Sequence, residues 1–99
     1  MNYGLRKTDI QYIIEALQSF NDIDQAILFG SRAMGNYKQG SDVDMAIKGK
    51  ELADTTIYRL SDLLNEELPL PYFFDIIVYD RINNKELKKH IDKFGKVIY

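Results

Sequence analysis

Cysteine is absent from this 99-residue sequence, and histidine occurs only once. The lack of cysteine excludes a disulfide framework and a thiolate zinc site, and the single histidine argues against any other zinc site. No apolar run approaches the ~20 residues of a membrane-spanning helix, and the N-terminus has no signal-peptide pattern. We therefore expect no membrane association and a cytoplasmic location, with which the absence of thiols is compatible.

Length and composition predict one small domain over residues 1–99. Apolar residues make up 45% of the chain and charged residues 28%, which is typical of a globular protein. The net charge is −2, but residues 81–99 carry six basic and two acidic side chains. We interpret this basic segment as the solvated face of a helix; the alternative is a docking patch for an acidic partner or a nucleotide. So small a patch on an acidic chain does not favour direct nucleic-acid binding.

The hydrophobic patterns predict an α/β (α+β) fold with a small mixed sheet. Helices are expected at residues 8–20, 52–67 and 84–94, and strands at residues 26–29, 42–48 and 73–79. Thr8 is the expected N-cap of the first helix, in a capping box with Gln11. Residues 97–99 either add a short edge strand or pack against the domain. We expect the helices to share one face of the sheet and to leave the other face free for chemistry.

Three aspartates stand where the predicted strands would bring them together. Asp42 and Asp44 are one residue apart on one strand, so their side chains share a face of the sheet. Asp75 interrupts the apolar strand at 73–79, where an acid is unusual unless it has a partner. If these strands are neighbours, the three carboxylates converge and offer the hard oxygen ligands that Mg²⁺ prefers. The ion would bind substrate phosphates, and the third acid would help to orient and deprotonate an attacking hydroxyl.

A glycine and a serine directly follow the strand predicted at 26–29. Gly30 permits close approach of the backbone to a ligand, and Ser31 offers a hydroxyl and an amide at the start of a helical turn. Arg32 adds a cation that would face the charge developing on a transferred phosphorus. Each feature alone is common in turns, caps and ion pairs. Their combination with the aspartates favours phosphate chemistry.

These motifs resemble the signature of the DNA polymerase β-like nucleotidyltransferase superfamily. The similar segments are Leu-Phe-Gly-Ser-Arg-Ala-Met-Gly at 28–35 and Ser-Asp-Val-Asp-Met-Ala-Ile at 41–47. The chain is more closely similar to the minimal nucleotidyltransferase (MNT) proteins, and the likeness covers nearly all of it. Two positions depart from that pattern, because Met34 replaces a residue that is often basic and Met45 replaces a frequent leucine.

The resemblance implies a role for each motif. The glycine–serine pair binds the nucleoside triphosphate, and this role falls on Gly30 and Ser31. The paired acids bind Mg²⁺, a role that falls on Asp42 and Asp44, and the third carboxylate of the family corresponds to Asp75.

The resemblance also implies a Mg²⁺-dependent transfer of a nucleotide, AMP from ATP, to a hydroxyl group. MNT proteins commonly pair with a helical HEPN-domain protein as antitoxin to its toxin, and some transfer AMP to a tyrosine of that partner. Because residues 1–99 leave no room for an acceptor-binding domain, we expect a partner protein to supply the acceptor, in a homo- or hetero-oligomer. The alternative hypothesis is a non-catalytic binding module that neutralises its partner by forming a complex.

Other residues give weaker signals. The segment Leu68–Tyr72 is either a contact surface or, as we favour, a loop packed over the edge of the sheet. Tyr37 is interpreted as an exposed loop residue, with stacking on a nucleobase as the alternative. His90 is interpreted as a surface or boundary residue, and Lys48 either pairs with the acids or lies beyond them.

Overall fold

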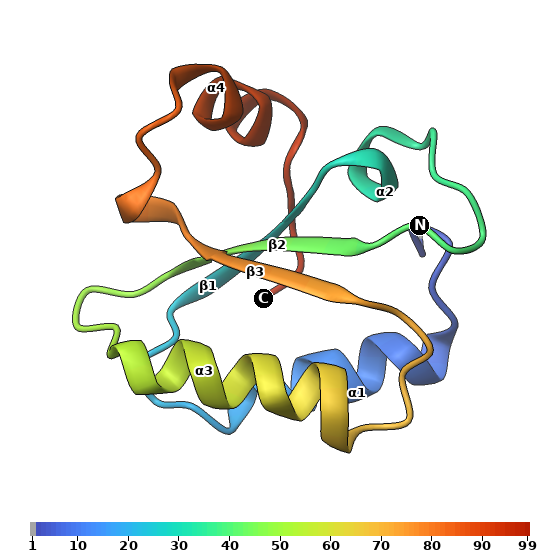
Figure 1. The fold of residues 1–99 in the computed structure, drawn as a ribbon, viewed down its shortest axis with the longest axis horizontal. Helices are drawn as coiled ribbons and strands as arrows, with labels where there is room; N and C mark the ends of the chain where they lie inside the picture. Colours follow the sequence, from blue (N-terminus) through green and yellow to red (C-terminus); the bar gives the residue numbers. More distant parts are fainter. Residues whose placement is uncertain (1) are drawn as a thin grey trace.

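A computed structural model describes residues 2–99 and shows a four-stranded sheet with four α-helices (Figure 1). In chain order the elements are α1 Lys7–Gln18, β1 Gln25–Phe29, α2 Ser31–Met34, β2 Val43–Lys48, α3 Asp54–Asp62, β3 Phe74–Val78, α4 Lys85–Phe94 and β4 Lys96–Val97. The helix α3 continues as a π-helical turn over Leu63–Glu67, and a 3₁₀ turn over Tyr79–Arg81 follows β3. None of the described helices has the length and apolar character needed to cross a membrane.

The sheet is mixed, with the strand order β3–β2–β1–β4. β1 lies antiparallel to both β2 and β4, whereas β2 and β3 are parallel. A parallel pair needs a crossover, and α3 supplies it. The expected mixed sheet is therefore confirmed, and of the two alternatives for residues 97–99 the edge strand is the one found, formed by Lys96–Val97.

The main core lies between the sheet and the helices α1 and α3, which share one face (Figure 1). Alternation along β2 sends Val43, Met45 and Ile47 into this core, where all three are fully buried. Leu17 of α1 and Leu60 of α3 meet them from the helical layer. Each such aliphatic side chain contributes roughly 1.5–3 kcal/mol by leaving water.

The helix α4 lies on the opposite face of the sheet, above the strands in Figure 1. Ile91 of α4 is buried against Ile27, Phe29 and Ala46, which point away from the main core. The expectation that the helices share one face therefore holds for α1 and α3 but not for α4. The physical reason is a second, smaller apolar patch on β1 and β2 that only a further helix can cover.

The start of α1 differs from the expected capping box. Thr8 lies inside the helix, and Arg6 is the N-cap, whose backbone N–H donates to Asp9 Oδ2 at 2.9 Å. The Arg6 guanidinium and the Tyr72 hydroxyl also donate to the buried Asp9 carboxylate. Burial alone would raise the pKa of Asp9, but these hydrogen bonds lower it from 3.8 to about 2.

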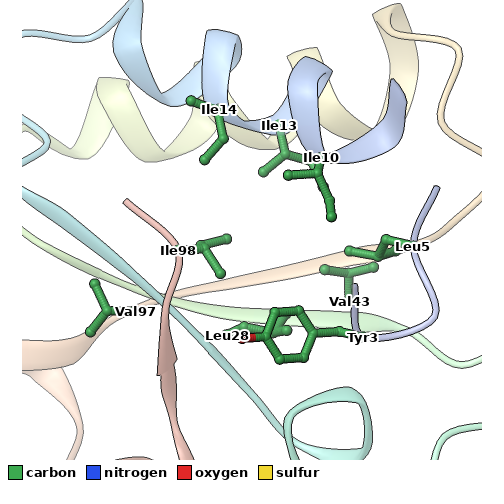
Figure 2. Close-up of a pocket in the computed structure, with 9 residues that line it drawn as sticks. All are labelled: Tyr3, Leu5, Ile10, Ile13, Ile14, Leu28, Val43, Val97 and Ile98. Carbon is green, nitrogen blue, oxygen red and sulfur yellow. The ribbon is translucent and has the colours of Figure 1, made fainter. Parts of the chain in front are cut away.

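An apolar cavity of about 220 Å³ lies between α1 and the end of the sheet at β4 (Figure 2). Its lining residues are Tyr3, Leu5, Ile10, Ile13, Ile14, Leu28, Val43, Val97 and Ile98. Val97 on its rim is exposed.

The proline-containing segment Leu68–Tyr72 contributes the buried Leu70 to the main core, so our preferred interpretation of that segment as a packed loop is confirmed.

Candidate functional site

Two of the three predicted aspartates lie directly opposite one another in the sheet. The register of the parallel strands pairs Asp44 of β2 with Asp75 of β3. Asp42 directly precedes β2 and is exposed, as is Asp75, whereas Asp44 is half-buried. Burial raises the pKa of Asp44, and the charges of Asp75 and Asp42 raise it further. The nearby His90 lowers this pKa, but by less. The site thus concentrates negative charge on the face that α4 only partly covers.

Gly30 lies against the Asp44 carboxylate at the end of β1. Phe29, the last residue of β1, pairs with Asp44 across the antiparallel ladder, so the chain leaves the strand beside this acid. Gly30 has φ +75° and ψ −154°, a conformation that favours glycine. A Cβ at this position would overlap Asp44 Oδ2. The close approach predicted for Gly30 is therefore made to a carboxylate of the protein itself.

Ser31 is the first residue of the four-residue helix α2. It is half-buried and directly follows Gly30, the residue that lies against Asp44. The structure therefore brings together the glycine, the serine and the paired acids, as the sequence predicts. Among residues 2–99 the described hydrogen bonds of Ser31 are made by its carbonyl, which accepts from Gly35 and Asn36.

Arg32 takes a different place from the one expected. Its side chain is 1% exposed, and its guanidinium donates to the carbonyl of Tyr3 at 3.0 Å and to the carbonyl of Ser41 at 2.8 and 3.2 Å. The ring centroids of Tyr72 and Tyr37 lie 4.9 and 5.4 Å from its central carbon. Arg32 therefore joins the N-terminal segment to the loop that leads into Asp42, and its donors are used within the protein. The expected free cation for phosphate is not found at this residue.

His90 contacts Gly30, and the sequence did not predict this contact. Its Nε2 accepts a hydrogen bond from the backbone N–H of Gly30 at 3.0 Å. Its ring also packs against Phe29 and Phe94, with centroid separations of 6.2 and 5.6 Å. The expected boundary position fits its half-buried state, but only the placement of α4 brings it to Gly30. One signal in the sequence was its neighbour Ile91, an inward-facing residue that fixes the helix on the sheet.

The two remaining candidates lie outside this group. Tyr37 is partly exposed and packs against Arg32, so its ring is engaged with a protein cation. Lys48 is at the other end of β2 from Asp44, and its Nζ lies 4.2 Å from the centroid of the Tyr79 ring. Lys48 therefore lies beyond the acids and does not pair with them.

The acids have the right chemistry for a divalent cation, but they do not form a closed cage. Across residues 2–99, no three His, Cys, Asp or Glu side chains lie close enough together to hold a metal ion. The donors available beside Asp44 are carboxylate oxygens, the type that Mg²⁺ prefers. Burial first and the charges of Asp75 and Asp42 second raise the pKa of Asp44, and a bound cation would offset both effects.

The family model described as "Polymerase beta, Nucleotidyltransferase" matches residues 11–99. No curated protein shows a significant match to the sequence. A chain from a toxin–antitoxin structure with AMP-PNP superposes with a TM-score of 0.72 and 22% identity, covering 91% of this chain and 72% of that one. The MntA–HepT toxin–antitoxin gives 0.67 and 19%, covering 95% and 72%. A Shewanella oneidensis complex of a tri-AMPylated HEPN toxin with an MNT antitoxin gives 0.68 and 18%, covering 96% and 72%. At these identities the superpositions establish the fold.

Proposed function

Because the chain belongs to the polymerase beta nucleotidyltransferase family, we propose that it transfers AMP from ATP to a hydroxyl of a partner protein. One observation carries this proposal: the paired acids Asp44 and Asp75 lie beside the Gly30–Ser31 loop, on the face of the sheet that α4 covers only in part. Carboxylates that bind a cation, next to a loop that binds phosphate, are the parts that nucleotidyl transfer needs.

We propose that Asp44 and Asp75 hold Mg²⁺ together with substrate phosphates, and that Asp42 joins them once those phosphates are bound, because no three acids of residues 2–99 lie close enough together to hold the ion in the free protein. A bound ion would neutralise charge on the triphosphate during transfer. Asp75 lies on β3, the outermost strand of the sheet, and is exposed, so an acceptor can reach it from solvent. We assign Asp75 the second task of accepting the proton from the attacking hydroxyl, since it is the acid on the open edge.

Gly30 and Ser31 are the proposed phosphate-binding pair. The absence of a side chain at Gly30 lets the backbone lie against Asp44, so phosphate on the loop and a cation on the acid would be neighbours. Ser31 supplies a hydroxyl and an amide as donors to phosphate oxygens. Arg32 acts indirectly in this proposal, because its hydrogen bonds to Ser41 hold the loop that ends at Asp42.

The proposed partner is a HEPN-domain toxin, and this protein would act as its antitoxin in the cytoplasm. The solved structures with the same fold include toxin–antitoxin complexes, one with AMP-PNP and one with an AMPylated HEPN toxin. The exposed Asp75 on the edge strand β3 is accessible to an acceptor that a second protein provides. A tyrosine hydroxyl of the partner is the proposed acceptor.

The test uses the protein co-expressed and co-purified with a HEPN-domain protein. Wild type with ATP and Mg²⁺ is expected to add AMP to the partner, which intact-mass measurement detects. The double variant Asp42→Ala, Asp44→Ala is expected to stay folded by circular dichroism and to add none. Transfer by a folded double variant would refute the assignment of these acids.

The second candidate function is a non-catalytic antitoxin. Two features favour it: Arg32 is buried rather than free for phosphate, and Met34 departs from the basic residue that the family resemblance implies at this position. Its test is whether cells that express the toxin survive with the folded double variant as they do with wild type. Full protection without the acids would favour binding alone.

A further inference from the structure

The backbone of Gly30 is held by a side chain from the far end of the chain. Its N–H donates to His90 Nε2 at 3.0 Å. A neutral imidazole that accepts at Nε2 carries its proton on Nδ1, so the contact also fixes the tautomer of His90. The loop beside Asp44 is therefore tied to α4.

The position of His90 follows from how α4 begins and where it packs. The side chain of Asn84 caps the helix by accepting from the N–H groups of Glu86 and Leu87 at 2.9 and 3.1 Å. Ile91 then anchors the helix in the apolar patch on β1 and β2. Because Ile91 is buried on the sheet, its neighbour His90 lies at the end of β1, beside Gly30, the first residue of the proposed phosphate-binding pair.

Aromatic contacts hold the imidazole in place. Phe29 meets the His90 ring edge-on, at an interplanar angle of 77°, and Phe94 lies one helical turn further along α4. The ring is thus supported on two sides, and its Nε2 is pointed at a backbone donor that has left the β-ladder. This arrangement can hold Gly30 in its positive-φ conformation without any contact to a substrate.

We propose that His90 is a positioning residue for nucleotide binding, which holds the Gly30–Ser31 peptide against Asp44 in a conformation ready for phosphate. The inference rests on the proposed function, because it assigns the loop to the triphosphate. It also implies that the N–H of Gly30 is occupied by its hydrogen bond to His90, so that the hydroxyl and amide of Ser31 donate to phosphate.

Two substitutions separate the hydrogen bond from the packing of the ring. His90→Phe keeps an aromatic ring between Phe29 and Phe94 but removes the acceptor. His90→Gln restores an acceptor, because the glutamine amide oxygen reaches about as far along the side chain as Nε2. Glu86→Gln, an exposed change on the same helix, is the matched control.

Affinity for ATP with Mg²⁺ is measured by calorimetry, and the Gly30 amide is followed by NMR in the free protein. His90→Phe is expected to weaken ATP binding about threefold to tenfold, the range of one neutral hydrogen bond, and to speed exchange of the Gly30 amide. His90→Gln and Glu86→Gln are expected to bind within about twofold of wild type, the size of a marginal interaction. The melting temperatures of His90→Phe and His90→Gln should agree.

Two results would overturn the inference while the proposed function stands. The first is an affinity for ATP in His90→Phe that equals that of wild type. The second is an equal loss of ATP affinity in His90→Phe and His90→Gln, accompanied by an equal fall in their melting temperatures. A wild-type protein that does not bind ATP would instead contradict the proposed function, and the role of His90 with it. The exchange of the Gly30 amide would still report whether the hydrogen bond exists.

Discussion

Asp44 and Asp75 face one another across the only parallel strand pair in the described sheet, and burial together with neighbouring carboxylates raises the pKa of Asp44. An apolar or neutral pair would be the more stable choice at this position in the free protein. The strain of two like charges is therefore localised at the proposed metal site.

Asp44→Asn is expected to stabilise the metal-free protein at neutral pH by up to about 1 kcal/mol, because Asp44 is half-exposed and solvent screens its repulsion. With a pKa above 3.8 in the folded state, the carboxyl holds its proton more tightly when folded than when unfolded. Ionisation of Asp44 therefore lowers the free energy of unfolding as pH rises above 3.8. The extra stability of Asp44→Asn should vanish well below pH 3.8, where the carboxyl is protonated in both the folded and the unfolded protein. Urea unfolding with EDTA at several pH values measures the difference.

Mg²⁺ supplies the complementary experiment on the same pair. It is expected to raise the melting temperature of wild type and to have little effect on Asp44→Asn. An equal rise in both proteins would show that the ion binds elsewhere.

Gly30→Ala and Gly35→Ala form a matched pair. Both glycines have positive φ: an alanine costs about 1–2 kcal/mol in the left-handed conformation of Gly35, and about 1–3 kcal/mol in the conformation of Gly30, which is nearly confined to glycine. A Cβ at Gly30 would also overlap the Asp44 carboxylate, whereas no atom lies within 4 Å of one at Gly35. Calorimetry is expected to show loss of ATP binding in Gly30→Ala and near-normal binding in Gly35→Ala. Similar affinities for the two variants would contradict the assigned role of Gly30.

Arg32→Lys tests whether the arginine is structural. Lysine keeps the charge but cannot reach the carbonyls of Tyr3 and Ser41 together, so we expect a loss of roughly 2–4 kcal/mol in the free energy of unfolding. Arg59→Lys, an exposed arginine beside Phe20, should change it by less than about 0.5 kcal/mol. Denaturant unfolding gives both values. Unchanged stability with weakened ATP binding would instead support direct contact with phosphate.

Asp9→Asn should destabilise the protein at neutral pH by roughly 1–3 kcal/mol, because the buried carboxylate receives hydrogen bonds from Arg6 and Tyr72. The pKa of Asp9 is about 2 when folded and 3.8 ordinarily, so its contribution is complete above 3.8 and disappears as pH falls towards 2. The gap between wild type and Asp9→Asn should close over that window. Asp62→Asn, an exposed change, should show no such closing in the same unfolding series.

Patterns with a strict period were the most informative part of the sequence. Alternation along two strands predicts that Asp44 and Asp75 share a face, and the register confirms that they are neighbours. The resemblance to nucleotidyltransferases rests on the segments 28–35 and 41–47, which span the end of β1, the helix α2 and most of β2, and the family match confirms it. These features follow from local geometry, which a single sequence records.

Features that depend on distant contacts were not predictable. Arg32 looks the same in the sequence whether it binds phosphate or is buried, because Tyr3, Ser41 and Tyr72 reach it only in the folded protein. The helical pattern around Ile91 predicts a buried stripe but not which face of the sheet receives it. The contact of His90 with Gly30 depends on that choice of face, so it appears only in three dimensions.

The crossover through α3 has a kinetic consequence. β2 and β3 are parallel, so the chain must pass over the sheet before Asp75 can stand next to Asp44. β3 is also the outermost strand, held in the sheet by β2 alone. A cation that needs both acids would have to be released before β3 could leave, so its main effect would be to lengthen the lifetime of the folded protein. Nucleotide turnover and resistance to unfolding would then depend on the same two carboxylates.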